Sequence, residues 1–298
     1  MSLQPVAPHV WRINIFNFVN AYFVRNAEGE FVLIDTGVRP ALTQLKAAAA
    51  ELGRPPIAIL LTHGHFDHAG CAGELARAWN VPVYAGRLEK PFLTGAAAYP
   101  PGDPTVGGAL AQVSRAIPPL KFDISDVLEI YPQDGKLDVL KGWQVIETPG
   151  HSPGHISLWH EDDRILLAGD ALCTADMDSV VGMTTLKPTQ FARGGTPFVP
   201  DWKEMKHSLG KLADLEPATV AAGHGHPMTG GSVPEQLRDF YHEFAPPEHG
   251  RYVGTPARTD ESGVTFLPPA PPDPLPRNVA IGALAGAAAF AILGRGRK

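Results

Sequence analysis

Cysteine is scarce in this chain: Cys71 and Cys173 are the only two among 298 residues. Two cysteines do not make the disulfide framework that holds small secreted domains together. The chain also does not open with a charged segment followed by an apolar one, as a secretory signal would. We therefore expect a reduced, cytoplasmic setting, and we interpret both cysteines as small buried apolar residues rather than metal ligands.

An excess of positive charge is missing as well. The chain has 25 basic and 31 acidic residues, which gives a formal net charge of -6. This balance offers no electrostatic attraction to nucleic acids or polyphosphates, so we expect a small-molecule substrate and no nucleic-acid partner. With 44% hydrophobic and 19% charged residues, the composition is that of a soluble globular protein with a sizeable core.

The chain offers little that could span a membrane. Its apolar tail, residues 279–294, is mostly alanine and glycine and is shorter than a spanning helix, which needs about 20 apolar residues. Basic residues follow the tail, and the usual bias would keep them on the cytoplasmic side with the rest of the chain. The spacing of Gly282 and Gly286, however, suits helix packing in lipid. Membrane association through the tail and a surface or helix-packing role both remain open.

What the chain does have is a loop rich in metal-ligating side chains. Residues 59–71 read ILLTHGHFDHAGC, an apolar strand that leads directly into His63, His65, Asp67 and His68. Imidazole nitrogen and carboxylate oxygen are the ligands that zinc and its first-row neighbours prefer. Because neighbouring side chains in a loop can point to opposite sides of a cavity, this stretch predicts ligands for two metal ions rather than one.

A second source of ligands is the segment TPGHSPGH, a tight turn between the expected strands 143–148 and 156–160. His151 stands at the tip of this turn, where a side chain projects beyond the edge of the sheet. His155 follows four positions later. We expect His151 to be a metal ligand and His155 to support a ligand or to pack.

Two further strands end in ligand-type residues. The expected strand 164–173 contains Asp170, and a carboxylate directly after a buried apolar run is costly unless it is paired or bound to a cation. A carboxylate that bridges two metal ions explains it well. The expected strand 218–227 reaches His224, with His226 as the alternative ligand.

Strands and helices alternate along most of the chain, which predicts an α/β layered fold. A hairpin with its turn at 27–30 opens the chain, and its second strand ends at Asp35. Asp35 serves either the turn itself or as an acceptor that orients a metal-ligating histidine. Further strands are expected at 57–61 and 81–85, and helices at 40–52, 70–79, 202–215 and 234–244.

Three stretches depart from this alternation. Residues 86–135 and 182–200 are rich in proline and glycine, which predicts irregular loops, and the first of them is expected to contact substrate. Residues 245–276 are proline-rich and predict an extended arm or linker with one short strand at 263–267. The expected organisation is a catalytic domain at 1–244, this arm, and a hydrophobic tail with a basic end at 277–298.

Taken in order, the motifs LIDTG, THGHFDH, TPGHSPGH, AGDAL and GHGHP make the chain resemble the metallo-β-lactamase superfamily over about residues 10–235. The resemblance implies an αβ/βα four-layer sandwich with a site for two divalent metal ions, zinc in the first place and iron or manganese as alternatives. It assigns His63, His65 and His151 to the first metal, Asp67, His68 and His224 to the second, and Asp170 to a bridge between them.

Asp170 narrows the expected function. A carboxylate at this point resembles glyoxalase II, the lactonases and the zinc phosphodiesterases, whereas several true β-lactamases place a cysteine or serine near it. The resemblance therefore implies a dinuclear metal-dependent hydrolase that activates water to cleave an ester, thioester or lactone of a small molecule. Asp67 is the expected catalytic residue, since a carboxylate not fully committed to its metal can pass a proton to the leaving group.

The sequence is also compatible with other functions on the same fold. A phosphodiesterase shares the metal ligands, although the chain lacks a basic surface signal. An iron-dependent redox enzyme would resemble the flavodiiron proteins, which place a glutamate at the position of His65, or a persulfide dioxygenase, which needs one iron and no Asp67 ligand. A non-catalytic scaffold fits the full ligand set poorly. A glutathione thioester is disfavoured as substrate, because a proline-rich stretch replaces the helical C-terminal domain of glyoxalase II.

Overall fold

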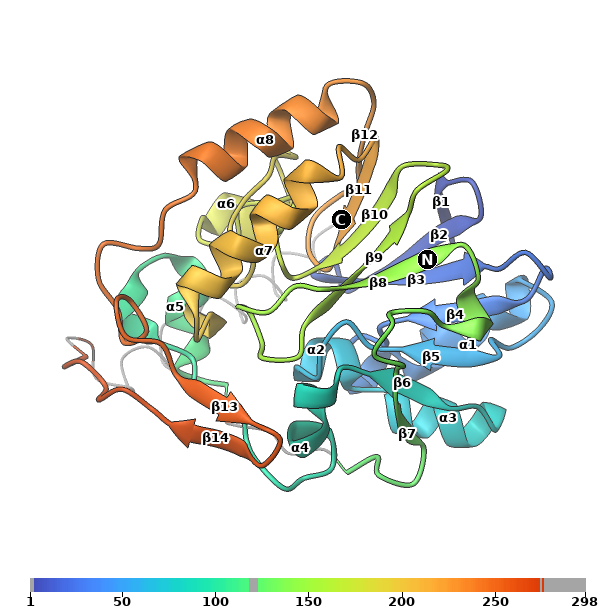
Figure 1. Ribbon diagram of the computed structural model, residues 1–298, viewed down its shortest axis with the longest axis horizontal. Helices are drawn as coiled ribbons and strands as arrows, with labels where there is room; N and C mark the ends of the chain where they lie inside the picture. The colour runs from blue at the N-terminus through green and yellow to red at the C-terminus, as the bar shows by residue number, and fades with distance from the viewer. Residues whose placement is uncertain (1–2, 118–122, 274, 276–298) are drawn as a thin grey trace, which may run out of the picture.

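The computed structural model describes residues 3–117, 123–273 and 275. Two β-sheets lie face to face between two layers of helices (Figure 1). Side chains from both sheets meet in one buried cluster, which includes Val32 and Ile34 from the first sheet and Leu158 and Leu167 from the second. The α/β class and the four-layer sandwich are therefore confirmed.

The first sheet has seven strands that lie in chain order. They are β1 Gln4–Ala7, β2 Val10–Ile15, β3 Val19–Arg25, β4 Phe31–Ile34, β5 Ala58–Leu60, β6 Val83–Ala85 and β7 Leu128–Ile130. The expected hairpin turn at 27–30 joins β3 to β4, but residues 10–25 before it fold as two strands, β2 and β3, rather than one. The reason is a tight turn at Phe16 and Asn17, both at positive φ, which reverses the chain.

The second sheet has five strands in the order β12-β11-β10-β9-β8. They are β8 Trp143–Glu147, β9 Ile156–His160, β10 Ile165–Gly169, β11 Thr219–Ala222 and β12 Met228–Thr229. The expected strands 164–173 and 218–227 are too long, because the chain leaves the sheet after Gly169 and Ala222. Gly169 makes this exit at a φ of 53°, where a side chain is disfavoured. Both exits lead into the ligand-bearing loops.

Helices cover the outer face of each sheet. Against the first sheet lie α1 Leu42–Glu51 and α3 Ala72–Trp79, and against the second lie α7 Trp202–Asp214 and α8 Val233–Glu243 (Figure 1). These match the four expected helices within a few residues. Asp201 caps α7 by accepting from the backbone N–H groups of Lys203 and Glu204, both at 3.0 Å.

The alternation of side chains along β5 shows why this layering is stable. Ile59 points toward the cluster shared with α1 and α3, whereas Leu60 points toward the second sheet. Both residues are fully buried, as expected for a central parallel strand covered on both faces. Each such side chain contributes about 1.5–3 kcal/mol of burial free energy.

Residues 86–135 are more regular than the sequence predicts. They contain α4 Lys90–Leu93, α5 Ala109–Ser114 and strand β7, which completes the first sheet beside β6. The expectation of a wholly irregular loop is wrong because proline at the first turn of a short helix does not oppose it, as at Pro91 in α4. The second such stretch overlaps α6 Val180–Thr185.

The proline-rich arm packs against the body of the molecule. It contains a hairpin of β13 Arg258–Asp260 and β14 Gly263–Phe266, one strand more than expected. The hydroxyl of Tyr252 donates to the carbonyl of Pro101 at 2.6 Å, and Arg115 forms an ion pair with Asp273 at 2.7 Å. The arm is thus fastened to the 86–135 region.

The apolar tail at 279–294 lies outside the described residues. Within the part of the chain that the structure describes, no helix has the length and apolar character needed to cross a membrane.

Candidate metal centre

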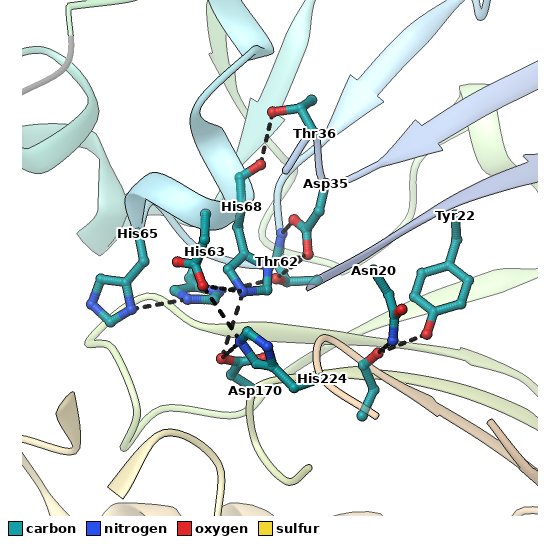
Figure 2. Close-up of polar contacts among 12 residues, drawn as sticks. Asn20, Tyr22, Asp35, Thr36, Thr62, His63, His65, His68, Asp170 and His224 are labelled. Carbon is teal, nitrogen blue, oxygen red and sulfur yellow. Dashed lines mark hydrogen bonds and ion pairs between the residues drawn. The ribbon is translucent and has the colours of Figure 1, made fainter. Parts of the chain in front are cut away.

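The predicted ligand residues meet at one edge of the sandwich, where loops after β5, β8, β10 and β11 converge. Figure 2 shows His63, His65, His68, Asp170 and His224 directed toward one another from both sheets. Asp67 and His68 lie on a single helical turn, α2 Phe66–Ala69, inside the stretch expected as a loop. All seven predicted ligand residues fall into groups whose ligand atoms lie within 4.8 Å of one another: His63, His65 and His151; His63, His68 and Asp170; and Asp67, His68 and His224.

The first group, His63, His65 and His151, consists of imidazoles only. Nδ1 of His65 lies 3.0 Å from Nε2 of His63 and 2.9 Å from Nε2 of His151. Burial, the main cause, lowers the pKa of His65 to about 4 and that of His151 to about 3, so both are neutral near pH 7. His151 donates from Nδ1 to the carbonyl of Gly194 at 3.2 Å, which leaves the lone pair of its Nε2 facing inward.

The second group, Asp67, His68 and His224, mixes imidazole with carboxylate. Nε2 of His224 lies 3.4 Å from Oδ2 of Asp67 and 3.3 Å from Oδ2 of Asp170. Burial alone would lower the pKa of His224, but the two carboxylates outweigh it and raise this pKa to about 10. Burial would likewise raise the pKa of Asp67, whereas His68 and His224 hold it at about 2. This group therefore carries charges of both signs.

Asp170 lies between the two groups. Its Oδ2 is 3.5 Å from Nε2 of His151 in the first group, and 3.5 and 3.3 Å from Nε2 of His68 and His224 in the second. The close approach of the β11 exit requires glycine, since a Cβ on Gly223 would lie 2.1 Å from Oδ1 of Asp170. One carboxylate is thus within reach of both groups.

The donor set fits divalent metal ions. Nε2 of His68 and Oδ1 of Asp170 are buried without any hydrogen-bond partner, which costs free energy if nothing binds them. Three neutral imidazoles also direct nitrogens at one another, and they do not hold enough protons to satisfy every contact. A cation between them removes both problems, and nitrogen and oxygen ligands of this kind suit zinc, iron or manganese.

Asp35 and His155 support this arrangement from behind. Oδ2 of Asp35 accepts from Nδ1 of His68 and from the hydroxyl of Thr62, both at 2.8 Å (Figure 2). Asp35 also occupies a turn at a φ of 58°, so both proposed roles apply. Nε2 of His155 accepts from the backbone N–H of Asp170 at 2.9 Å, and its other nitrogen contacts Thr148, which is the supporting position predicted for it.

The remaining candidates lie away from the ligand groups. His226 contacts Arg12 at 2.9 Å and joins none of the groups, so His224 is the residue that the strand end delivers. Cys71 and Cys173 are buried and outside the groups, as expected for apolar residues. Burial raises the pKa of Cys71 to about 12, which keeps it a thiol.

Sequence reasoning missed residues that hold the loop of His224 in place. The side-chain amide of Asn20 donates to the carbonyls of Ala222 and Gly225 at 2.9 and 2.8 Å, and the hydroxyl of Tyr22 donates to Ala222 at 2.6 Å (Figure 2). The sequence feature that could have revealed them is Asn20, which lies inside the apolar run of β3. A buried side-chain amide needs hydrogen-bond partners, so this residue indicates a contact with another segment.

A small cavity of about 90 Å³ opens beside the ligands. Residues of the 86–135 and 182–200 stretches contribute to its wall, among them Tyr99, Leu110 and Phe198. Both stretches therefore lie beside the ligand residues. Contact between the 86–135 stretch and a substrate stays a prediction.

Known proteins resemble the chain in sequence and in structure. The probable metallo-hydrolase YflN of Bacillus subtilis is 39% identical over 230 residues, which cover 74% of this chain and 86% of that protein. The hydroxyacylglutathione hydrolase of Bdellovibrio bacteriovorus is 28% identical over 168 residues, covering 55% and 53%. Among solved structures, TTHA1623 in a di-iron-bound form has a TM-score of 0.51 at 31% identity, and covers 76% of this chain and 94% of its own.

The B3 metallo-β-lactamase BLEG-1 is similar in structure too, with a TM-score of 0.52 at 27% identity, covering 76% and 95%. Residues 14–224 match the metallo-beta-lactamase superfamily as a whole, a range that contains all seven residues of the ligand groups. The sandwich, the converging strand ends and this match lead to one conclusion: the chain belongs to the metallo-β-lactamase superfamily.

Proposed function

We propose that the protein is a metal-dependent hydrolase that holds two divalent metal ions and cleaves an ester, thioester or lactone of a small molecule. The observation that carries the proposal is the position of Asp170, within 3.5 Å of nitrogens from both ligand groups. A carboxylate between two groups is what a two-metal site needs and what a single-metal site does not. The ions would be held by His63, His65 and His151, by Asp67, His68 and His224, and by Asp170 between them.

When bound, such ions lower the pKa of water and polarise a carbonyl oxygen. The protein's own residues would do the rest. Asp67 lines the cavity and its pKa of about 2 keeps it ionised, so its carboxylate would be the group placed to pass a proton to the leaving group. The apolar wall would exclude bulk water from the reacting groups.

The similar proteins support assignment to the hydrolases, and the identity of the bound metal is a matter for metal analysis. The relative YflN is named a probable metallo-hydrolase, and the hydroxyacylglutathione hydrolase is a thioesterase by name. We propose zinc, while the di-iron-bound neighbour makes iron the first alternative. A redox enzyme with one iron would leave Asp67 without a ligand role. We further propose a cytoplasmic location and leave membrane association through 279–294 as a second proposal.

The test combines metal analysis with a panel of esters, thioesters, lactones, phosphodiesters and a β-lactam. We expect about two metal ions per chain and hydrolysis that a chelator abolishes. Asp170→Asn should lower the metal content, and it should lower kcat/KM by more than the roughly 10–100-fold that losing a supporting group costs. Asp162→Asn, at an exposed carboxylate, is the matched control. Full activity in the metal-free protein would overturn the proposal.

A further inference from the structure

The cavity beside the ligands has a small volume and a largely apolar wall. Its wall presents side chains of Phe18, Phe66, Leu110, Met177 and Phe198. At about 90 Å³ it is well below the roughly 300–1,000 Å³ of sites for drug-sized ligands. It therefore has room for a short group beside the reacting bond.

No described residue in the wall of this cavity is a lysine or an arginine. The lining residues that carry charge are Asp67, Asp170 and His224, and all three belong to the ligand groups. Tyr99 also lines the cavity, but its hydroxyl donates to Glu89, so it offers a substrate only its ring. Away from the ligand groups, a substrate's negative charge would thus meet no counter-charge in the wall.

The arginines nearest to the wall in sequence are already paired. Arg115, two residues from the lining residue Ile117, is bonded to Asp273 of the arm by two contacts of 2.7 and 2.9 Å. Arg193, two residues from the lining residue Gly195, contacts Asp178 at 3.1 Å. Freeing either one for a substrate would break an existing ion pair.

We infer that the part of the substrate that faces this apolar wall is a short, uncharged acyl or alcohol group. This inference rests on the proposed function and narrows it. Moving a carboxylate from water into an apolar wall without a partner costs several kcal/mol, whereas an alkyl chain gains from the same move. An acyl or alcohol group that ends in a carboxylate therefore fits the apolar wall poorly.

A matched pair of substrates tests the inference. 4-Nitrophenyl butyrate and the 4-nitrophenyl monoester of succinic acid share the leaving group and chain length and differ in a terminal methyl against a carboxylate. With spontaneous hydrolysis subtracted, we expect kcat/KM to favour the butyrate by about 10–100-fold. Phe198→Lys should narrow or reverse this preference, and Phe198→Leu should keep it.

Each outcome has a distinct meaning. If the metal-loaded protein hydrolyses neither ester nor any of the panel, the proposed function fails. If it hydrolyses both esters and does not prefer the butyrate, the function stands and the inference of an uncharged group at the apolar wall is wrong. Because the wild-type protein alone decides this, a failure of Phe198→Lys to fold does not weaken the test.

A second, independent observation concerns Glu89, a fully buried carboxylate that the mechanism does not use. Its Oε1 accepts from the hydroxyl of Ser152 and the backbone N–H of Gly154, both at 2.7 Å. Its Oε2 accepts from the backbone N–H of Gly64 at 2.9 Å and from the hydroxyl of Tyr99. Four donors fill the acceptor capacity of one carboxylate.

Three of these four donors belong to two different ligand loops. Gly64 stands between His63 and His65, and Ser152 follows His151 directly. Glu89 therefore links directly the two segments that supply the all-imidazole group. The geometry points to Glu89 as a positioning residue that sets the separation of these segments and hence the affinity for the first metal.

Glu89→Gln tests this role with almost no change in shape. The new NH₂ group must face a backbone N–H at one loop or the other, so one link is lost. We expect the affinity for the first metal to fall by about 10–100-fold, as measured by competition with a chelator at a temperature where the variant is folded. The absorption spectrum of bound cobalt(II) should change as well.

Two controls separate positioning from general stability. Tyr99→Phe removes one donor and keeps both backbone links, so it should leave metal affinity near that of the wild type. Glu51→Gln alters an exposed carboxylate on α1 and should change nothing. A Glu89→Gln protein that unfolds at lower temperature but binds metal with unchanged affinity would overturn the positioning role.

Discussion

The two ligand groups differ in how they exist before a metal arrives. The first, His63, His65 and His151, is a set of neutral imidazoles whose pKa values burial has lowered. The second, Asp67, His68 and His224, contains histidines whose pKa values the neighbouring carboxylates raise. Before a metal binds, the histidines of the first group are therefore neutral and have unprotonated ring nitrogens. In the second group, protonated histidines already form ion pairs with the carboxylates. A metal must displace protons from the second group only.

Breaking the first group should have the largest effect. His65→Ala removes the nitrogen that lies 3.0 and 2.9 Å from its two neighbours. We expect one metal ion per chain to be lost and kcat/KM for ester hydrolysis to fall by about 100-fold or more. His207→Ala, at an exposed histidine on α7, should change neither metal content nor activity. Retention of two ions in His65→Ala would contradict the assignment.

The pH dependence of metal binding should distinguish the groups next. His224 has a pKa of about 10 without metal, so binding near pH 7–9 releases its proton and should tighten as pH rises, by about tenfold per unit for each proton released. His65 and His151, with pKa values of about 4 and 3, release none in this range. Calorimetry in buffers of different ionisation enthalpy counts the protons. Equal proton release on metal binding at both sites would contradict the difference in histidine protonation between the two groups.

The metal-free fold should respond to acid through the same histidines. The folded-state pKa values of His65 and His151 lie below the unfolded value of about 6.5, so the unfolded chain binds more protons as pH falls. The stability of the metal-free protein should thus decrease between pH 6.5 and about 4, as followed by urea unfolding. A metal-free protein equally stable at both pH values would count against neutral buried imidazoles.

Asp35→Asn should weaken the second group alone. Asparagine tolerates the positive φ at this position, so the turn is kept while one acceptor for Thr62 or His68 is lost. We expect the second metal to bind about 10–100-fold more weakly and the first to bind as before. Stepwise titration with cobalt(II) would show it. If both metals weaken together, the two groups are coupled through more than Asp170.

The smallest expected effect is that of Thr148→Val. Its hydroxyl contacts Nδ1 of His155 at 2.8 Å and Ser157 at 3.0 Å, behind the metal centre. Losing these contacts should cost about 0.5–1.5 kcal/mol in the free energy of unfolding, measured with urea, with little change in metal content. A large loss of metal would mean that His155 does more than support Asp170.

The sequence predicts the ligands better than the elements that carry them. Each of the seven residues stands where an apolar run stops, and this pattern is local, so it can be read without a structure. The helical turn α2 and the strand β7 could not be predicted in the same way. Both depend on partners distant in sequence: β7 pairs with β6, which lies more than 40 residues before it. Glu89 gave no signal for the same reason, since its donors come from three separate segments.

The ion pair between Arg115 and Asp273 has a consequence for the order in which the protein is completed during synthesis. The guanidinium of Arg115 is almost fully buried, and its carboxylate partner is made 158 residues later. The ion pair between the arm and the segment that carries Leu110 and Ile117 can therefore form only after residue 273 has left the ribosome. A chain ended at residue 244 would hold every metal ligand and would lack this ion pair.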